Sequence, residues 1–212
     1  MRPVSHPHWP PGLRLYPGLL EANQRRALLA DVVAALETAP FFTPRMPRTG
    51  KPFSVRMTNF GPLGWVSDRQ HGYRYQAHHP DTGAPWPPMP DMLLRLWRKL
   101  TEYPAPPQAA LVNHYRPGAK MGLHVDNDER DLSAPILSIS LGCEATFRIG
   151  GHQRRGKTIS FRLRDGDVLI LGGHSRLCYH GVDRIHPGTG ELPAPIGEGR
   201  INITLRRYGE LP

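Results

Sequence analysis

Cysteine is scarce in this chain of 212 residues, which contains only Cys143 and Cys178. Two cysteines exclude a disulfide framework and a four-cysteine zinc site, and their apolar neighbours predict buried free thiols. The sequence also lacks a run of ~18 to 20 apolar residues, the length of a membrane span. Because residues 1–11 have no apolar signal-peptide core either, we expect a cytoplasmic protein without a membrane partner.

Acidic residues are the minority among the charged residues. The sequence contains 18 Asp and Glu but 27 Lys and Arg, which gives a formal net charge of +9 with neutral histidine. This excess favours a polyanionic partner, with nucleic acid first, although a basic surface that only keeps the protein in solution fits the charge as well. The length suits one compact unit, and we expect a monomer.

Proline and glycine, with 24 and 22 residues, divide the chain unevenly. We expect a loose arm over residues 1–17. Apolar residues at helical spacing predict a helix over residues 18–39, which Pro40 ends. A second apolar stripe predicts a helix over residues 91–103, before Pro104.

The predicted helices divide the chain into three parts of one compact unit. Residues 1–40 form the N-terminal arm and helix, residues 41–90 hold aromatic residues in short hairpins and loops, and residues 91–212 form the core. Short strand-like runs separated by glycine-containing turns are typical of a β-sandwich or barrel. The predicted strands span residues 110–115, 136–141, 145–149, 158–163, 167–171, 177–182 and 200–207. We therefore expect a mainly β fold with flanking helices and a double-sheet jelly roll as its core.

His124 and Asp126 are candidates to bind one metal ion, because residues two apart on extended backbone point to the same side. A third ligand must come from a facing strand, and His180 lies within an apolar run. Two neutral imidazoles and one carboxylate form the facial triad of non-haem iron(II) oxygenases, which leaves coordination positions open. A hydrolytic zinc site could use the same three ligands, and a histidine in an apolar strand is more often a core residue.

Other histidines are weaker candidates for this site. His79 and Asp81 have the same spacing, but they lie in sequence rich in proline and glycine with no predicted strand around them. His174 and His186 fall in turn-like sequence. We therefore expect no metal at the His79 pair and choose neither of the other two as the third ligand.

The last predicted strand alternates polar and apolar residues, so that one face is polar. The polar residues are Arg200, Asn202, Thr204 and Arg206. An ordinary amphipathic strand with its polar face in water would show the same alternation. A polar face directed into the barrel would instead bind the carboxylates of 2-oxoglutarate, because arginine supplies planar, permanently charged donors. Asn113 and Tyr115 would add hydrogen bonds, and a zinc hydrolase has no evident use for this set.

A series of motifs follows in a fixed order through residues 53 to 208. The motifs are Asn113 to Ala119, His124 to Glu129, Ala134 to Gly142, Gly166 to Val168, Gly172 to Gly181 and the Arg-x-Asn-x-Thr-x-Arg strand that ends at Arg206. Their combination closely resembles the AlkB family of Fe(II)- and 2-oxoglutarate-dependent dioxygenases. These enzymes directly reverse alkylation damage to nucleobases.

The resemblance implies a double-stranded β-helix core in which His124, Asp126 and His180 hold Fe(II). It also implies that 2-oxoglutarate and O₂ are the co-substrates, and that Arg200, helped by Tyr115, holds the distal carboxylate of 2-oxoglutarate. The residues implied at the iron-proximal end are Arg206, Asn202 and Asn113.

The resemblance further implies a nucleotide-recognition lid in residues 41–90, which includes Met57. Trp65 would stack on the flipped base, Tyr73 and Arg154 would contact the substrate, and Asp128 would meet the exocyclic amine of the base. The sequence departs from the family pattern at His71, an extra residue inside the lid, and in the segment 152–158 that contains Arg154. Residues 1–40 match the pattern poorly.

The implied reaction is the oxidative demethylation, or direct repair, of N-alkylated bases such as 1-methyladenine and 3-methylcytosine. The substrate would be single-stranded DNA or RNA, or duplex DNA, and the reaction would use Fe(II), O₂ and 2-oxoglutarate and release succinate, CO₂ and formaldehyde. A 2-oxoglutarate dioxygenase that acts on a protein or small molecule is one alternative, against which the lid argues. A noncatalytic nucleic-acid-binding module is another, against which the complete triad argues.

Overall fold

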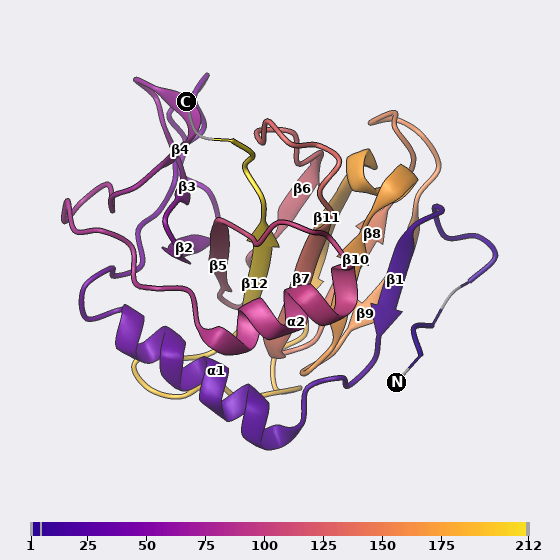
Figure 1. Cartoon of the computed structure of the whole chain (residues 1–212), viewed down its shortest axis with the longest axis horizontal. Helices are drawn as coiled ribbons and strands as arrows, with labels where there is room; N and C mark the ends of the chain where they lie inside the picture. The colour runs from indigo at the N-terminus through magenta and orange to yellow at the C-terminus, as the bar shows by residue number, and fades with distance from the viewer. Residues whose placement is uncertain (1, 5, 211–212) are drawn as a thin grey trace.

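The structure is a computed structural model that describes residues 2–4 and 6–210, and it contains two antiparallel sheets, a hairpin and two helices (Figure 1). The larger sheet has the strand order β1 (Leu13–Tyr16), β10 (Val168–Leu171), β7 (Ile136–Gly142), β12 (Arg200–Arg206), β5 (Ala109–Tyr115) and β2 (Arg56–Phe60). The smaller sheet has the order β6 (Met121–His124), β11 (His180–Ile185), β8 (Ala145–Ile149) and β9 (Ile159–Leu163). The strands β3 (Gly64–Asp68) and β4 (Gly72–Gln76) form the hairpin.

The two faces of the larger sheet bury different partners. On β12, Ile201, Ile203 and Leu205 belong to a hydrophobic cluster that also contains the buried residues of both helices. The helices α1 (Ala22–Ala35) and α2 (Asp91–Thr101) lie over this outer face (Figure 1). Alternation along a strand sends the intervening polar residues of β12 to the opposite face, toward the smaller sheet.

Side chains from both sheets meet in a second cluster between them. Leu111 and Leu169 of the larger sheet join Phe147, Ile149 and Val182 of the smaller sheet there. Two antiparallel sheets packed on a shared core are the architecture of the predicted jelly roll. The interior between the sheets therefore holds both apolar residues and the polar face of β12.

The N-terminal part differs from the predicted loose arm. Leu13–Tyr16 forms β1, which pairs with β10 at the edge of the larger sheet. The prediction of a loose arm over residues 1–17 is wrong at this strand, because β1 is too short to show periodicity. The helix begins at Ala22 rather than Gly18, because Gly18 has a positive φ of 55° and a capping box at Glu21 starts the first turn.

The segment 41–90 also contributes more to the core than predicted. Its strand β2 is buried and pairs with β5 in the larger sheet. The β3–β4 hairpin is separate from both sheets. The three-part division of the chain stays a prediction.

Two further differences lie near the candidate site. Residues 177–182 do not form one strand: a 3-10 helix, η1 (Gly173–Leu177), is followed by β11, which starts at His180. The short strand β6 was not among the predicted strands.

Both cysteines are free and buried, as their neighbours predict. Among the helices of the described residues, none has the length and apolar character needed to cross a membrane.

Candidate functional site

His124 and His180 occupy directly opposed positions on two neighbouring strands. His124 is the last residue of β6, His180 is the first residue of β11, and the two are partners in the antiparallel register. Asp126 follows β6 by two residues. The strand pairing thus brings together two histidines that are 56 positions apart in the sequence and adds the carboxylate from the adjoining loop.

The three side chains converge on one small volume. The Nε2 atom of His180 lies 3.3 Å from Oδ2 of Asp126, and Nε2 of His124 lies 3.6 Å from Oδ1. One donor atom from each residue lies within 4.8 Å of the other two. Asp126 and His180 are buried, whereas His124 is half-exposed. The geometry therefore allows the three residues to coordinate one ion while one side of it stays open to a cavity.

Backbone carbonyls orient both imidazoles. Nδ1 of His124 lies 2.9 Å from the Gly122 oxygen, and Nδ1 of His180 lies 3.0 Å from the Cys178 oxygen. When Nδ1–H donates to a carbonyl, Nε2 keeps its lone pair for a metal ion. Desolvation, with a contribution from His180, lowers the pKa of His124 to about 4, which favours the neutral, metal-binding form.

Asp126 is ionised although it is buried. Burial opposes its charge, but the guanidinium of Arg206 holds the pKa of Asp126 well below its ordinary value. Nη2 of Arg206 lies 2.8 Å from Oδ1 of Asp126. Two neutral imidazoles and a carboxylate suit Fe(II), because this set balances part of the ion's charge and leaves coordination positions for other ligands.

The polar face of β12 points into the same cavity, which has a volume of about 480 Å³. Asn113 and Tyr115 lie directly opposite Asn202 and Arg200 in the register of β5 and β12. The structure therefore excludes the alternative of an amphipathic strand with its polar face in bulk water. All five predicted co-substrate residues line the cavity, namely Asn113, Tyr115, Arg200, Asn202 and Arg206.

Arg200 provides a test of whether these residues fit a dicarboxylate. It is almost completely buried, with 1% of its surface exposed, and its Nε and Nη1 atoms have no hydrogen-bond partner within the described residues. Desolvation lowers its pKa to about 10, so the guanidinium is still charged at neutral pH. A buried cation with free donors that face a cavity fits a bound carboxylate, since leaving such a charge unpaired is costly. The donor set therefore fits 2-oxoglutarate.

The predicted substrate residues line the same cavity. The Trp65 ring stacks on Tyr73 with centroids 5.6 Å apart, and its Nε1 donates to Oδ2 of Asp128 at 2.8 Å. Trp65 is buried, Tyr73 is exposed, and both line the cavity. Met57 of β2 and Arg154 of the β8–β9 turn also line it. The fold thus gathers all five predicted substrate residues in the lining of one cavity.

Glu129 is a central residue for which the sequence patterns predict no role. It is buried and accepts hydrogen bonds from Arg206 at 2.8 Å and Arg176 at 3.0 Å. The hydroxyl of Tyr75, on β4, donates to the same carboxylate. Glu129 and Arg176 both lie within the motifs, and a buried charge in a motif is the signal that could have identified them. Glu129 thereby connects the β3–β4 hairpin to the residues around the candidate metal centre.

His79 serves the local backbone, as expected for the weaker of the two histidine pairs. Its Nε2 lies 2.7 Å from the Pro40 carbonyl, and its Nδ1 accepts the backbone N–H groups of Asp81 and Thr82 at 3.1 Å. Both ring nitrogens are occupied. The structure therefore gives no metal-binding role to His79.

Comparisons with known proteins agree on the family. Residues 12–206 match the family model described as the 2OG-Fe(II) oxygenase superfamily. The chain is 54% identical over 197 residues to the alpha-ketoglutarate-dependent dioxygenase AlkB homolog of Caulobacter vibrioides strain NA1000 / CB15N, covering 93% of this chain and 88% of that protein. It is 41% identical over 192 residues to the alpha-ketoglutarate-dependent dioxygenase AlkB of Escherichia coli strain K12, covering 89% and 87%.

A solved structure gives the same result for the fold. The structure of OsALKBH1 matches with a TM-score of 0.81 at 28% identity, over 95% of this chain and 99% of that one. The predicted double-stranded β-helix is therefore confirmed, as are the dioxygenase class and its dependence on Fe(II), 2-oxoglutarate and O₂. The chain belongs to the AlkB family within the 2OG-Fe(II) oxygenase superfamily.

Proposed function

We propose that this dioxygenase oxidatively demethylates N-alkylated bases such as 1-methyladenine and 3-methylcytosine in DNA or RNA, releasing succinate, CO₂ and formaldehyde. One observation carries the proposal: His124, Asp126 and His180 share a single cavity with the polar face of β12 and with the aromatic residues of the lid. A methyl group attached to a base held at the lid would therefore reach the candidate metal centre.

In this proposal the chain's residues bind and orient the reactants. His124, Asp126 and His180 would hold Fe(II), and Arg200 and Arg206 would hold the two ends of 2-oxoglutarate. When bound, Fe(II) and 2-oxoglutarate supply the oxidation of the N-methyl group by O₂. The apolar core between the sheets would keep water away from the reactants.

The lid would recognise the base itself. A target base must leave its stack, which costs a few kcal/mol and costs least for a damaged, poorly paired base. Stacking against Trp65 or Tyr73 would offset this cost by about 1 to 3 kcal/mol. Asp128 lines the cavity, and its Oδ2 accepts a hydrogen bond from the Trp65 ring. The same carboxylate would also accept a hydrogen bond from the exocyclic amine of the base.

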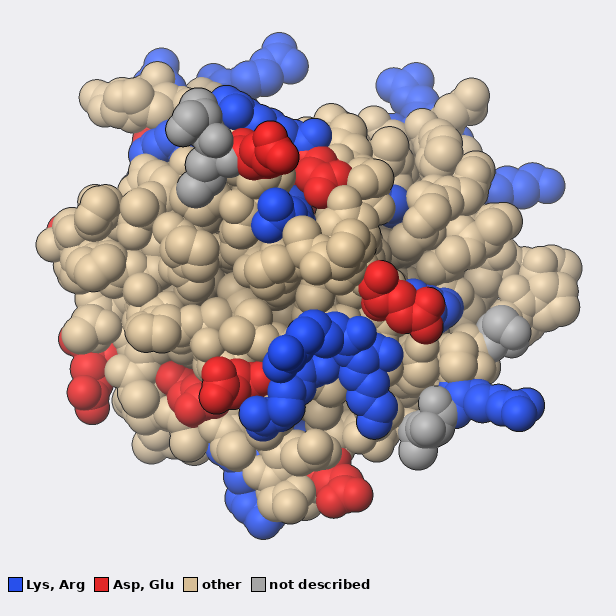
Figure 2. All heavy atoms as spheres, in the orientation of Figure 1, with Lys and Arg blue, Asp and Glu red and all other residues tan. Residues whose placement is uncertain are grey.

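Charge supports a nucleic acid as the carrier of the base. The net charge is +9, and basic side chains project from the upper edge of the molecule, where the β3–β4 hairpin lies (Figures 1 and 2). The names of two shorter matches state nucleic-acid substrates: the tRNA demethylase abh1 of Schizosaccharomyces pombe and the DNA N(6)-methyladenine demethylase ALKBH1A of Arabidopsis thaliana. They are 35% and 38% identical to this chain over 109 and 123 residues.

We also propose that the enzyme acts as a monomer in the cytoplasm. One chain supplies the candidate metal ligands, the co-substrate face and the lid, so catalysis requires no second copy. Single-stranded DNA or RNA is the preferred substrate in this proposal, because a base in a single strand is already unpaired.

The test is formaldehyde and succinate release with Fe(II), ascorbate, 2-oxoglutarate and a single-stranded oligonucleotide that contains one 1-methyladenine or 3-methylcytosine. An unmethylated oligonucleotide of the same sequence is the matched control, and the Asp126→Ala variant is the control for metal dependence. We expect stoichiometric formaldehyde and succinate with the methylated strand only. No turnover of either methylated base, together with robust turnover of a methylated peptide or free amine, would reject the proposal.

A further inference from the structure

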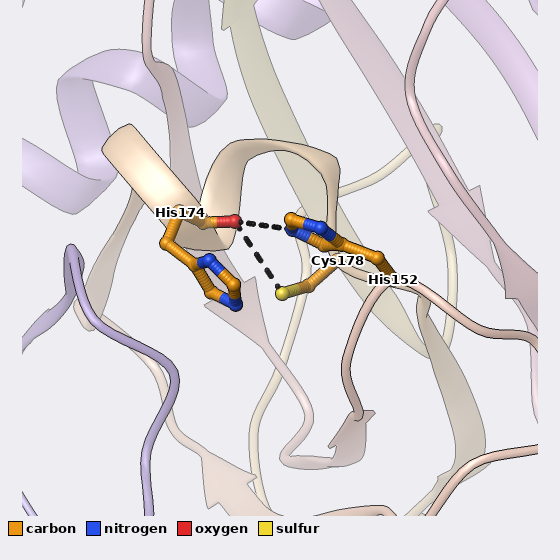
Figure 3. A group of neighbouring side chains, drawn as sticks. All are labelled: His152, His174 and Cys178. Atoms are coloured by element: carbon orange, nitrogen blue, oxygen red, sulfur yellow. Dashed lines mark hydrogen bonds between the residues drawn. The ribbon is translucent and has the colours of Figure 1, made fainter.

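A second group of metal-binding side chains lies outside the candidate active site. His152, His174 and Cys178 each offer one ligand atom, and these three atoms lie within 4.8 Å of one another. The side chains gather around the His174 carbonyl oxygen (Figure 3). None of the three has a part in the proposed demethylation.

Two separate elements supply these residues. His152 belongs to the turn between β8 and β9. His174 lies in η1, and Cys178 directly follows η1 as its C-cap residue. Backbone hydrogen bonds hold the turn beside this segment: Tyr179 N–H donates to the Gly151 oxygen at 3.0 Å, and Gly150 N–H donates to the Tyr179 oxygen at 2.8 Å. The proximity of the three side chains is therefore built into the backbone.

The present contacts within the group engage one ring nitrogen of His152 and leave its other nitrogen available. Nε2 of His152 lies 2.9 Å from the His174 oxygen, so Nδ1 keeps its lone pair for a metal ion (Figure 3). The imidazoles of His152 and His174 stack with centroids 4.2 Å apart, and both are exposed. The Cys178 thiol is buried and makes only a long contact of 3.5 Å to the His174 oxygen (Figure 3). A thiol is a weak hydrogen-bond donor, so a metal ion would displace little when it binds the sulfur.

We propose that His152, His174 and Cys178 form a second metal site, for Zn²⁺ or a similar late transition-metal ion, that fastens the β8–β9 turn to η1. Thiolate and imidazole ligands select such ions over Mg²⁺ or Ca²⁺. A tetrahedral zinc ion, with bonds of about 2.0 Å to nitrogen and 2.3 Å to sulfur, holds its ligand atoms about 3.3 to 3.6 Å apart. The three ligand atoms lie within 4.8 Å of one another, so the two exposed imidazoles would move closer to the sulfur when the ion binds, and water would supply the fourth ligand.

The site is chemically distinct from the iron site. His124, Asp126 and His180 offer nitrogen and oxygen, whereas this group adds sulfur. The ion would also fix the turn that carries Arg154, which lines the cavity. The proposal does not depend on the proposed substrate, because its tests measure metal binding rather than turnover.

Cobalt(II) provides the test, because thiolate ligation gives a sulfur-to-cobalt charge-transfer band that the iron site cannot produce. The full chain, reduced and freed of metal, is titrated with Co²⁺. We expect the band to saturate at one equivalent of sulfur-ligated metal, to disappear in Cys178→Ser and to be displaced by Zn²⁺. Cys143→Ser is the matched control and should keep the band, since Cys143 lies outside the group and donates to the Gly190 oxygen.

Two variants of exposed residues test the imidazoles without disturbing the core. His152→Gln and His174→Gln should each weaken Co²⁺ binding at the sulfur site by at least about 10-fold, because each removes one of three protein ligands. Hydrogen exchange gives an independent measurement: Zn²⁺ should slow the exchange of the amides of residues 152–157 in the unaltered chain but not in His174→Gln.

Three results would overturn the second site. The first is the absence of the sulfur band in the unaltered chain. The second is an equal Co²⁺ affinity in both histidine variants and the unaltered chain, which would mean that the thiol binds metal alone. The third is a band that survives in Cys178→Ser and is lost in Cys143→Ser. If Cys178→Ser fails to fold, the two histidine variants decide the question.

Discussion

The guanidinium of Arg206 lies 2.8 Å from the Asp126 carboxylate and, through its other terminal nitrogen, 2.8 Å from Glu129. One side chain therefore joins a candidate metal ligand, the predicted co-substrate face and a buried carboxylate. The contacts hold Asp126 ionised, and they raise the pKa of Arg206 well above its ordinary value even though burial opposes this. Substitutions in this group should therefore affect metal binding, co-substrate binding and stability together.

Glu129→Gln should destabilise the protein strongly. It would leave the charge of Arg176 without its buried counter-charge and Arg206 with Asp126 alone, and breaking such a buried pair costs about 3 to 5 kcal/mol. Urea unfolding followed by circular dichroism measures this loss. Glu144→Gln is the control, because Glu144 pairs with the partly exposed Arg162 and should lose no more than about 1 kcal/mol. Equal losses in the two variants would contradict the structural role of Glu129.

Arg200→Lys should weaken the binding of 2-oxoglutarate. The lysine keeps the charge but loses the planar pair of donors, and a hydrogen bond to a charged group contributes about 1.5 to 3 kcal/mol. We expect the KM for 2-oxoglutarate to rise about 10- to 100-fold, as measured by succinate release. Arg207→Lys is the control, because the Arg207 side chain lies outside the cavity and donates to the Pro106 carbonyl. The KM of this variant for 2-oxoglutarate should not change. An unaltered KM in Arg200→Lys would reject the assignment of this residue.

Metal and co-substrate should stabilise the protein through Asp126. A ligand present at 100 times its Kd adds about 2.7 kcal/mol, which corresponds to a rise in Tm of about 5 to 10 °C for a chain of this length. Mn²⁺ replaces Fe(II) as the ion in this measurement, together with 2-oxoglutarate. We expect the rise in the unaltered chain, its loss when a chelator is added, and no rise in Asp126→Ala. A similar rise in that variant would place the ion elsewhere.

Trp65 should contribute to binding of the base but not to reaction of the co-substrate. Trp65→Ala removes the stacking surface and should raise the KM for a methylated oligonucleotide about 5- to 150-fold, as expected for about 1 to 3 kcal/mol. Slow succinate formation without oligonucleotide should be unchanged. Trp65→Phe keeps an aromatic ring while it loses the hydrogen bond to Asp128, so its KM for the oligonucleotide should lie between those of the unaltered chain and Trp65→Ala. If Trp65→Ala lowers both activities equally, the residue has only a packing role.

Exposed basic residues within the predicted lid segment, residues 41–90, should contribute to the salt dependence of nucleic-acid binding. Replacing Arg48 and Lys51 with glutamine removes up to two phosphate contacts, each of which contributes about 0.7 to the slope of log affinity against log salt on a single strand. Fluorescence anisotropy between about 50 and 200 mM salt measures that slope. The matched control replaces the exposed Arg98 and Lys99 on α2, on the helical face, and should leave it unchanged. Equal effects of the two double variants would show that binding follows net charge alone.

Sequence patterns predicted the regular parts of the fold well and the short parts poorly. The alternation in Arg200–Arg206 predicted both the strand and its polar face, because every second side chain points the same way. The strands β1, β6 and β10 have four residues each, which is too short for a recognisable period. Only β10 was predicted, because all four of its residues are apolar, whereas β1 and β6 mix apolar with other residues. The 3-10 helix before His180 was also missed, since glycine and serine in that segment suggest a turn.

The sequence by itself determined the chemistry available to this protein: two imidazoles, one carboxylate and a strand of arginines, in an order that resembles the AlkB family. Only the tertiary structure decided which side chains meet. The register between β6 and β11 sets His124 opposite His180, and the packing of the two sheets directs the polar face of β12 into the cavity. The roles of Glu129 and the proximity of His152, His174 and Cys178 depend on contacts between distant segments. Local periodicity carries no information about such contacts, because packing of the whole chain fixes them.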